Sequence, residues 1–466
     1  MLAFAIGPMV AAAISLVTLP FVAWFFSPED VGRLTMLQVM LSLGSLLFTL
    51  GMNQAYVREY HEEVDKARLF KNAILPGSLL LLGLVVVVLL QPYSLSKLLF
   101  GLDSPTLTAY LLTSIISSFF IYFFGHVVRM QERGLAFSIT QIVPKLLLVV
   151  LIAIVLIFKL PAVFQTLMLM NTVAILSTFI IVAWLTRDTW YTAVFSEICY
   201  ASLRKMLIFS LPLVLGSLAY WGLNTSDRFF LRNYAGFEEL GIYSMSASLA
   251  GGVAVLSTIF SNIWHPVVYK WIKQGVNVEK IVFVTETMLV AVSLVWSLIG
   301  SLSWLLRYLL PEEYRVVQYL ITASVAGPLL YILSETTVVG INISRKSGYA
   351  MLASVTAFFV SAGLNFIFIP KYGASAAAIS SMIAFFVFFT VRTECSVRLW
   401  QPIPRLRIYL AILAYMVTTC IFVSCQQSSV WMPALWLMPF LFVCLIFSAR
   451  VKDLLSVMSN KITFIK

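Results

Sequence analysis

Apolar runs of about 20 residues recur along the whole chain, and this repetition constrains the fold more than any other feature. A helix of about 20 apolar residues crosses a hydrocarbon core about 30 Å thick. Because lipid cannot pair backbone N–H and C=O groups, such runs are predicted to be helical. Hydrophobic residues make up 61% of the 466 residues and charged residues 11%, against roughly 25% charged in soluble proteins. The chain is therefore predicted to be an all-α integral membrane protein.

The runs predict about fourteen transmembrane helices. The amino-terminal run has no basic region ahead of it and is too long for the core of a signal peptide, so it is interpreted as the first span. The predicted spans are 2–26, 34–55, 72–91, 106–126, 138–158, 164–185, 207–231, 239–262, 281–306, 318–343, 350–369, 376–392, 408–425 and 431–449.

The distribution of Lys and Arg orients these spans. With both termini cytoplasmic, the inner segments carry 22 of the 31 basic residues and the outer loops carry seven. This is the excess expected of cytoplasmic loops, so both termini are predicted to lie on the cytoplasmic side. The net charge of +11 then reflects topology and attraction to anionic lipid, and no nucleic-acid partner is expected.

Two pairs of segments resemble each other within the chain. Residues 25–60 align without gaps against 234–269, and a weaker similarity joins 131–157 to 345–369. The interval covers six spans, which is an even number, so both halves enter the membrane in the same direction as parallel repeats. The predicted division is a six-helix half (1–190), a cytoplasmic linker (191–206), a second six-helix half (207–398), and two extra helices with a cytoplasmic tail (399–466).

This organisation is typical of secondary transporters, which hold the substrate in a central cavity between their halves and alternate its access. The outer loops are short, which argues against an enzyme, and no nucleotide-binding GxxxxGK[ST] motif occurs. Five cysteines and three histidines show no metal-binding spacing, so neither a metal nor another cofactor is expected. Energy would come from a proton or sodium gradient, the membrane potential or the substrate's own gradient, and the sequence leaves this open.

Three motifs carry a resemblance to a known family: SPEDVG (27–32), NQAYVREYHEEVDKARLFK (53–71) and SDRFFLRNYAGFEELGIYSMS (226–246). In order and spacing they resemble the O-antigen and polysaccharide flippases (Wzx-type) of the polysaccharide transporter family, in the multidrug/oligosaccharidyl-lipid/polysaccharide (MOP) exporter superfamily. The resemblance covers essentially the whole chain. Those flippases usually have a few polar or basic residues before the first span, whereas this chain begins almost inside it. The resemblance therefore predicts that the amino terminus is truncated.

The resemblance implies a bacterial inner-membrane protein that carries an undecaprenyl-diphosphate-linked oligosaccharide to the outer leaflet, for lipopolysaccharide O-antigen or another surface polysaccharide. Its implied partners are this lipid-linked substrate, the bilayer, and the polysaccharide polymerase and chain-length proteins. A peptidoglycan-precursor flippase and a cation-coupled multidrug exporter of the same superfamily stay open as alternatives.

Charged and polar residues inside spans are the candidates for a substrate cavity, because they are unfavourable in lipid. Lys145 follows Pro144 and lies roughly 10 Å from the inner boundary at ~1.5 Å per residue. It either faces the diphosphate or extends back to the interface. Glu335 lies at a similar depth and would pair with Lys145 or another cation across the two halves, exchange an ion, or make a structural hydrogen bond. Asn342, two turns later, would extend the polar strip.

The remaining candidates lie near span ends. Asp227 and Arg228 fall near the outer end of the seventh span; as helix neighbours they point about 100° apart, so each is expected to have its own partner. They are interpreted either as an outer gate or product-side contact, or as an interfacial anchor. Arg58, Arg129 and Arg133 would contact the diphosphate at the inner entrance or act as ordinary positive-inside residues.

Overall fold

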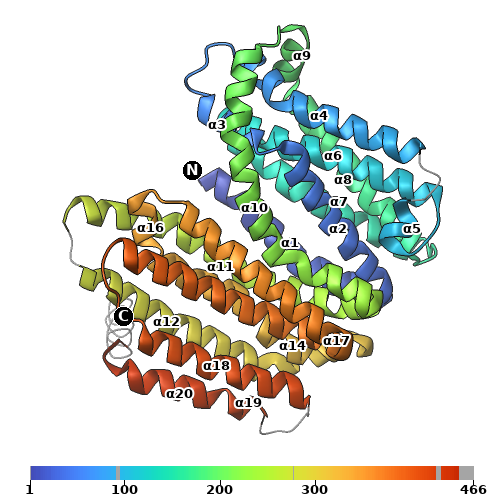
Figure 1. The fold of residues 1–466 in the computed structure, drawn as a ribbon. Coiled ribbons are helices and arrows are strands. Elements are labelled where there is room, and N and C mark those ends of the chain that lie inside the picture. The colour runs from blue at the N-terminus through green and yellow to red at the C-terminus, as the bar shows by residue number, and fades with distance from the viewer. Residues whose placement is uncertain (1, 91–94, 276–277, 427–431, 451–466) are drawn as a thin grey trace, which may run out of the picture. The chain divides into compact units, whose positions relative to one another are not determined.

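The computed structural model describes residues 2–90, 95–275, 278–426 and 432–450. Every regular element within these ranges is an α-helix or a short 3-10 helix (Figure 1). The predicted all-α class is therefore confirmed.

The chain divides into two compact units, Met1–Phe229 and Phe230–Lys466. The boundary between them lies within one long helix, α10. Helices of the first unit are α1 (Leu2–Ala23), α2 (Pro28–Thr49), α3 (Met52–Glu59), α4 (Lys66–Leu90), α5 (Leu95–Phe100), α6 (Pro105–Met130), α7 (Gly134–Ile157), α8 (Phe164–Leu185), α9 (Arg187–Phe195) and most of α10 (Tyr200–Tyr234). Those of the second are α11 (Gly236–Lys273), α12 (Val278–Leu302), η1 (Ser303–Leu305), α13 (Leu306–Leu309), η2 (Glu312–Tyr314), α14 (Val317–Ser324), α15 (Ala326–Thr337), α16 (Val339–Ser344), α17 (Gly348–Leu399), α18 (Leu406–Cys425), α19 (Met432–Leu435) and α20 (Leu437–Ile446).

The described part of the chain contains twelve helical segments long and apolar enough to cross a membrane. The difference from the fourteen predicted spans has two sources. Helix α17 contains the predicted spans 350–369 and 376–392, joined through a non-helical Gly373 with φ 51° and ψ −131°. The last predicted span corresponds to α19 and the ten-residue α20, which is too short to count alone.

Two predicted spans are interrupted by breaks that their hydrophobicity does not reveal. The second ends where Leu50 and Gly51 adopt left-handed conformations (φ 48° and 68°) between α2 and α3. A Cβ on Gly51 would lie 2.8 Å from the carbonyl oxygen of Ser210 on α10, so only glycine fits this close approach. The tenth divides into α14, α15 and α16, with breaks after Ser324 and Thr337.

Serine caps followed by proline explain where two helices begin. Ser27 Oγ accepts the N–H of Asp30 at the start of α2, and Ser104 Oγ accepts that of Leu107 at the start of α6. Proline follows each cap, at a position where its missing N–H is not needed. Helix α2 consequently starts six residues before the predicted limit of 34, because its first turn is polar.

In the first unit α6 packs against α2 and α8, and α1 packs along α7, which also contacts α8. An aromatic core lies where α3, α4 and α6 meet. Tyr56 is fully buried there, with Phe70 and Phe123 at ring-centroid distances of 6.4 and 5.9 Å. The short helix α9 packs against α4 beside this core.

In the second unit α15 packs against α11, α12 and α17, so its side chains are almost all buried. Helices α18 and α20 pack on α12. The Ser297 and Tyr415 hydroxyls lie 2.7 Å apart there, and Trp296 Nε1 donates to the Thr322 carbonyl at 2.9 Å. Buried polar side chains therefore tie these apolar helices together through hydrogen bonds, as is needed where water is absent.

Both members of the weaker sequence repeat begin with the same unusual turn. Glu132 precedes α7 with φ 57°, and Arg345 precedes α17 with φ 55°, both left-handed. In the first unit α6 contacts α2, α4 and α8, and in the second unit α15 contacts α11, α12 and α17. Counted within each half, the fourth predicted span thus contacts the helices that contain the second, third and sixth. These features agree with the internal repeat, while the domain limits read from the sequence stay a prediction.

Candidate functional site

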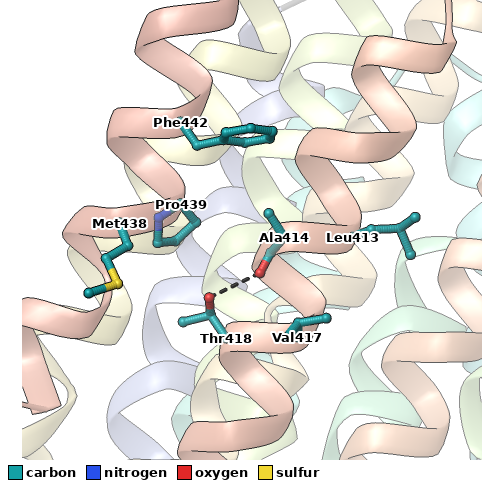
Figure 2. Close-up of a pocket in the computed structure, with 7 residues that line it drawn as sticks. All are labelled: Leu413, Ala414, Val417, Thr418, Met438, Pro439 and Phe442. Carbon is teal, nitrogen blue, oxygen red and sulfur yellow. Dashed lines mark hydrogen bonds between the residues drawn. The ribbon is translucent and has the colours of Figure 1, made fainter.

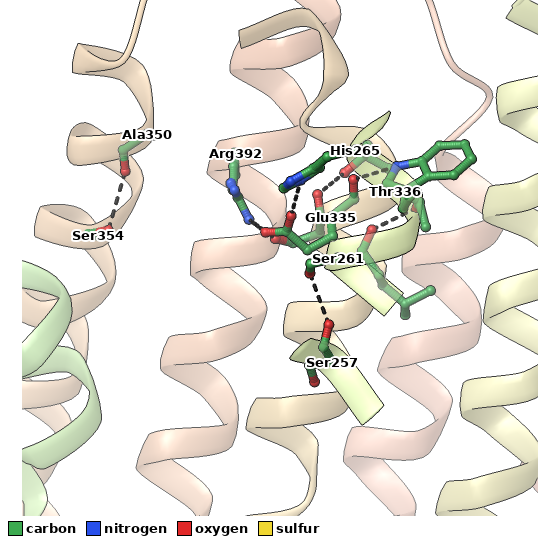
Figure 3. A network of polar contacts seen from close by, with 12 residues as sticks. Ser257, Ser261, His265, Glu335, Thr336, Ala350, Ser354 and Arg392 are labelled. Atoms are coloured by element: carbon green, nitrogen blue, oxygen red, sulfur yellow. Dashed lines mark hydrogen bonds and ion pairs between the residues drawn. The ribbon is translucent and has the colours of Figure 1, made fainter. Parts of the chain in front are cut away.

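A charged cluster lies inside the second unit, where α11, α15 and α17 meet (Figure 3). Glu335 on α15 is buried, with 2% of its surface exposed. Its Oε1 accepts a hydrogen bond from Arg392 Nη1 on α17 at 2.7 Å, and its Oε2 lies 2.7 Å from His265 Nε2 on α11. One carboxylate thus joins two basic side chains from two other helices.

The surrounding groups hold the arginine and the carboxylate in place. Arg392 Nη1 also donates to Ser334 Oγ at 2.5 Å, and its guanidinium lies 5.7 and 5.4 Å from the ring centroids of Tyr331 and Phe388. Trp264 Nε1 donates to the backbone carbonyl of Glu335 at 3.1 Å. The attraction between the guanidinium and the two aromatic rings offsets part of the hydration free energy that the guanidinium loses on burial.

Hydroxyl groups extend the network along the same helices. The Thr337 and Thr393 hydroxyls lie 2.7 Å apart, and the Gly340 N–H donates to Ser396 Oγ at 2.8 Å. Ser257 Oγ on α11 donates to the Pro328 carbonyl at 3.1 Å. The contacts run from α11 through α15 to α17, so a change of charge at Glu335 acts on all three helices.

The exposure of the three charged side chains differs. The Glu335 and Arg392 side chains are 2% and 12% exposed, whereas that of His265 is 36% exposed. The imidazole is therefore the accessible member of the cluster. It stacks on Tyr269 at a ring-centroid distance of 6.2 Å.

The first unit contains a neutral cluster on the repeat-related helices α3 and α6. Asn53 is buried, and its Nδ2 lies 3.4 Å from Tyr122 Oη and 3.2 Å from His126 Nε2. His126 Nδ1 is buried without a hydrogen-bond partner among the described residues. Each half thus has a polar cluster between its second and fourth spans, and among the described residues of these two clusters it is the one in the second half that contains side chains of opposite charge.

The deep candidates from the sequence lie in different places. Lys145 on α7 is half-buried, and its Nζ donates to the Ala11 carbonyl of α1 at 3.1 Å. The partners of Glu335 described above belong to its own unit, so the contacts that the structure shows for this carboxylate join helices within one half. Asn342 is half-buried on α16, where its carbonyl accepts the N–H of Arg345.

Asp227 and Arg228 lie seven and six residues before the end of α10. Asp227 is buried, its Oδ1 accepts the backbone N–H of Arg228 at 2.8 Å, and the same oxygen lies 3.9 Å from Arg228 Nη1. Arg228 Nη1 donates to the Asn224 carbonyl at 2.6 Å. Arg228 thus has a partner of its own within its helix, as expected for helix neighbours, and the Asp227 carboxylate bonds the arginine's backbone.

The entrance candidates are spread over the first unit. Arg58 lies over the Phe209 ring at 4.4 Å, with Glu59 Oε1 at 3.8 Å from its Nε. Arg129 is exposed at the end of α6. Arg133 is also exposed, and its Nη1 donates to the Leu185 carbonyl at the end of α8 at 2.7 Å.

Sequence reasoning missed His265 and Arg392. His265 lies beyond the predicted span that ends at 262, and Arg392 is the last residue of the span 376–392, whereas α11 continues to Lys273 and α17 to Leu399. One signal was present: Ser257, Ser261 and His265 are spaced by four residues, which places them along one face of a helix. A polar stripe leading to a histidine inside an apolar helix marks a candidate site.

An apolar groove of about 420 Å³ lies between α18 and α20 (Figure 2). Its one hydroxyl, on Thr418, donates to the Ala414 carbonyl at 3.0 Å and is thus already paired. The groove can hold a hydrocarbon chain but offers no group for a charged ligand. Its lining residues are Leu413, Ala414, Val417, Thr418, Met438, Pro439 and Phe442.

Comparisons with known proteins agree with a transporter. The family model described as "Polysaccharide biosynthesis protein" matches residues 1–270, and comparison with curated proteins gives no match. The solved structure "Lipid II flippase MurJ, inward closed conformation" is similar with a TM-score of 0.65 at 14% identity, over 98% of this chain and 100% of that one.

Two MATE structures also share the fold. A multidrug resistance MATE family transporter of the MOP superfamily is similar in its inward-facing form with a TM-score of 0.58, over 84% of this chain and 95% of that one. An outward-facing form has a TM-score of 0.52, over 85% and 94%; both are 15% identical to this chain. The chain thus has the MOP transporter fold and is a multi-pass membrane protein.

Proposed function

The chain belongs to the polysaccharide biosynthesis protein family, and from this premise we propose that it is a lipid-linked oligosaccharide flippase. It moves an undecaprenyl-diphosphate-linked repeat unit of a surface polysaccharide from the inner to the outer leaflet of the bacterial cytoplasmic membrane by alternating access. The observation that carries the proposal is the family match over residues 1–270 on a MOP transporter fold. Both termini are cytoplasmic, and the polysaccharide polymerase and chain-length proteins act on the product.

The chemistry of this substrate assigns roles to several residues. A diphosphate needs cationic partners in a water-excluding protein, where charge-assisted hydrogen bonds are strongest. Lys145 is a partly buried cation inside a span, and within the part of the chain that the structure describes its Nζ donates to the carbonyl of Ala11. A diphosphate can replace that carbonyl because it is the stronger acceptor. Arg228 binds the same group near the outer end of α10.

The His265–Glu335–Arg392 cluster is the proposed coupling site. Sodium prefers a shell of oxygen ligands, and two basic side chains on one carboxylate repel a further cation. Imidazole is the side chain suited to exchange a proton at physiological pH, and His265 is the accessible member of the cluster. We therefore favour a proton over sodium as the coupling ion.

Complementation tests the function. The chain is expressed in a strain that lacks its own surface-polysaccharide flippase, and surface glycan is measured with matched repeat units. We expect surface glycan to be restored. Membrane insertion without any restored glycan would contradict the proposal.

A second experiment tests the coupling. Export should fall when a proton ionophore is added and should not respond to a sodium ionophore. His265→Gln should lower export and remove its dependence on the proton gradient, whereas His61→Gln, at an exposed histidine outside the spans, should behave as wild type. Equal sensitivity of wild type and His265→Gln to the proton ionophore would exclude this histidine from coupling.

A peptidoglycan-precursor flippase is the second candidate, favoured by the fold shared with MurJ over 98% of the chain. A strain depleted of its peptidoglycan-precursor flippase distinguishes the two, because only the second candidate restores growth there. Multidrug export is the third reading, and resistance to organic cations in an exporter-deficient strain tests it.

A further inference from the structure

Helix α9 is a short amphipathic helix between two membrane spans, α8 and α10. Its Trp190 and Ala193 pack against the aromatic core of the first unit, while Tyr191, Val194 and Phe195 are 60–73% exposed. An exposed apolar face beside spanning helices is stable where lipid covers it. Helix α9 therefore lies at a membrane surface.

Two adjoining cavities open beneath this helix. One, of about 350 Å³, lies between α9 and α4, α6 and α8, and the other, of about 690 Å³, lies along α8 and α9. They share Phe179, Ala183 and Trp190 as lining residues, so the two cavities adjoin there and are considered together as one groove. We call this the α9 groove; its lining is mainly aromatic and aliphatic, which suits a hydrocarbon chain.

Basic side chains lie at both ends of the α9 groove. At one end Arg187 lines the larger cavity and lies over the Trp184 ring at 4.9 Å. Arg133 is not a lining residue, but it donates to the carbonyl of Leu185, two residues before Arg187, at 2.7 Å. At the other end Lys71 Nζ donates to the Val194 and Ser196 carbonyls at 2.9 and 2.6 Å, which fixes the end of α9.

One acidic residue lines the α9 groove. Asp188 is 93% exposed and lies 3.7 Å from Arg187 Nε, so it neutralises little of the positive charge in water. Arg187 is itself 56% exposed, which leaves its guanidinium accessible to a second anion. An apolar groove with accessible cations at its end is complementary to a lipid with an anionic head group.

We propose that the α9 groove binds one anionic phospholipid from the leaflet at which α9 lies. One acyl chain occupies the groove along Phe179, Ala183 and Trp190, and the phosphate is bound by Arg133 and Arg187. The site lies wholly within the first unit and does not depend on the substrate that the protein transports. Through Lys71 and the ends of α8 and α9, the bound lipid stabilises the segment that connects the two halves of the repeat.

The test is native mass spectrometry of the full chain in a neutral detergent, titrated with phosphatidylglycerol or with phosphatidylcholine of the same chains. We expect one phosphatidylglycerol to bind more tightly than phosphatidylcholine. Each basic residue near a head group contributes about 1 kcal/mol, so replacing two should raise Kd roughly thirtyfold. The variant is Arg133→Gln with Arg187→Gln; the control is Arg315→Gln, an exposed arginine that also pairs with an acidic neighbour.

A second variant tests the groove itself. Ala183→Phe fills the part shared by both cavities and leaves the arginines intact, so it should also weaken phosphatidylglycerol binding, with an unchanged gel-filtration profile. Unchanged binding in Ala183→Phe, or in the double arginine variant, would overturn the proposal. Equal binding of the two lipids, or displacement of phosphatidylglycerol by equimolar undecaprenyl diphosphate, would overturn it too, since the site would then lack head-group preference or belong to the substrate.

Discussion

Replacing Glu335 with glutamine should destabilise the second unit strongly. The substitution removes the charge that Arg392 meets at 2.7 Å while leaving the guanidinium 12% exposed. Removing one partner of a buried ion pair costs about 3–5 kcal/mol, because the other charge stays buried. Ser334 Oγ, the nearby rings and the new amide oxygen still contact the arginine, so we expect the lower end, about 3 kcal/mol.

Thermal unfolding in detergent measures this loss. For a unit of this size 1 kcal/mol corresponds to a shift of about 2–4 °C, so Glu335→Gln should lower Tm by roughly 6–12 °C. The control is Glu312→Gln. Glu312 is 87% exposed in an ion pair with Arg315, and such surface pairs contribute about 0–1 kcal/mol. That variant should unfold within about 4 °C of the wild type.

A double variant distinguishes charge from packing. Glu335→Gln combined with Arg392→Met removes both charges, so no buried charge is left without its partner, which is the main cost of breaking a buried pair. Most of the lost Tm should therefore return. A Glu335→Gln variant with the wild-type Tm, or a double variant less stable than the single one, would refute the reasoning.

Three further predictions concern other sites. Gly77→Ala should lower Tm by several degrees, because a Cβ there would lie 2.1 Å from the Phe48 carbonyl oxygen and overpacking costs about 1–3 kcal/mol; Gly83→Ala on the same helix meets nothing within 4 Å and is the control. Lys145→Met should abolish most glycan export at normal membrane abundance, and Lys145→Arg should keep part of it; unchanged export in Lys145→Met would remove this lysine from the site. Arg228→Gln should reduce glycan export at normal membrane abundance, because it removes the cation proposed to bind the diphosphate near the outer end of α10; export at the wild-type level would exclude this arginine from the site.

The helical class and the approximate spans could be predicted because lipid imposes one solution on an apolar run of sufficient length. The internal breaks could not. Gly51 interrupts the second span because of its contact with Ser210, 159 positions later, and hydrophobicity does not record such contacts. By contrast, the separation of the spans 350–369 and 376–392 could be predicted, because Pro370 and Gly373 lie between them and Gly373 adopts a non-helical conformation that kinks α17 there.

The candidate site was predicted only in part. Glu335 was found because a carboxylate inside an apolar span is conspicuous, but its partners were not. His265 lies 70 positions away in sequence, in the part of α11 that extends beyond the predicted span, and Arg392 lies 57 positions away, at the end of its predicted span. Pairing between side chains on different helices depends on which faces pack together, and periodicity within each helix does not determine that.

Comparison of the two repeat-related halves distinguishes features that helix packing requires from features that occur in one half. Residues 25–60 and 131–157 align with the second half at offsets of 209 and 214, which place His126 opposite a position between Glu335 and Gly340. The first unit packs these helices around the neutral cluster of Asn53 and His126, so the packing does not require a buried ion pair. If the charges of the second half serve coupling, the double variant Glu335→Gln/Arg392→Met should regain stability yet still fail to export glycan. Recovery of both properties together would mean that the cluster only joins helices, and the coupling site would have to be sought elsewhere.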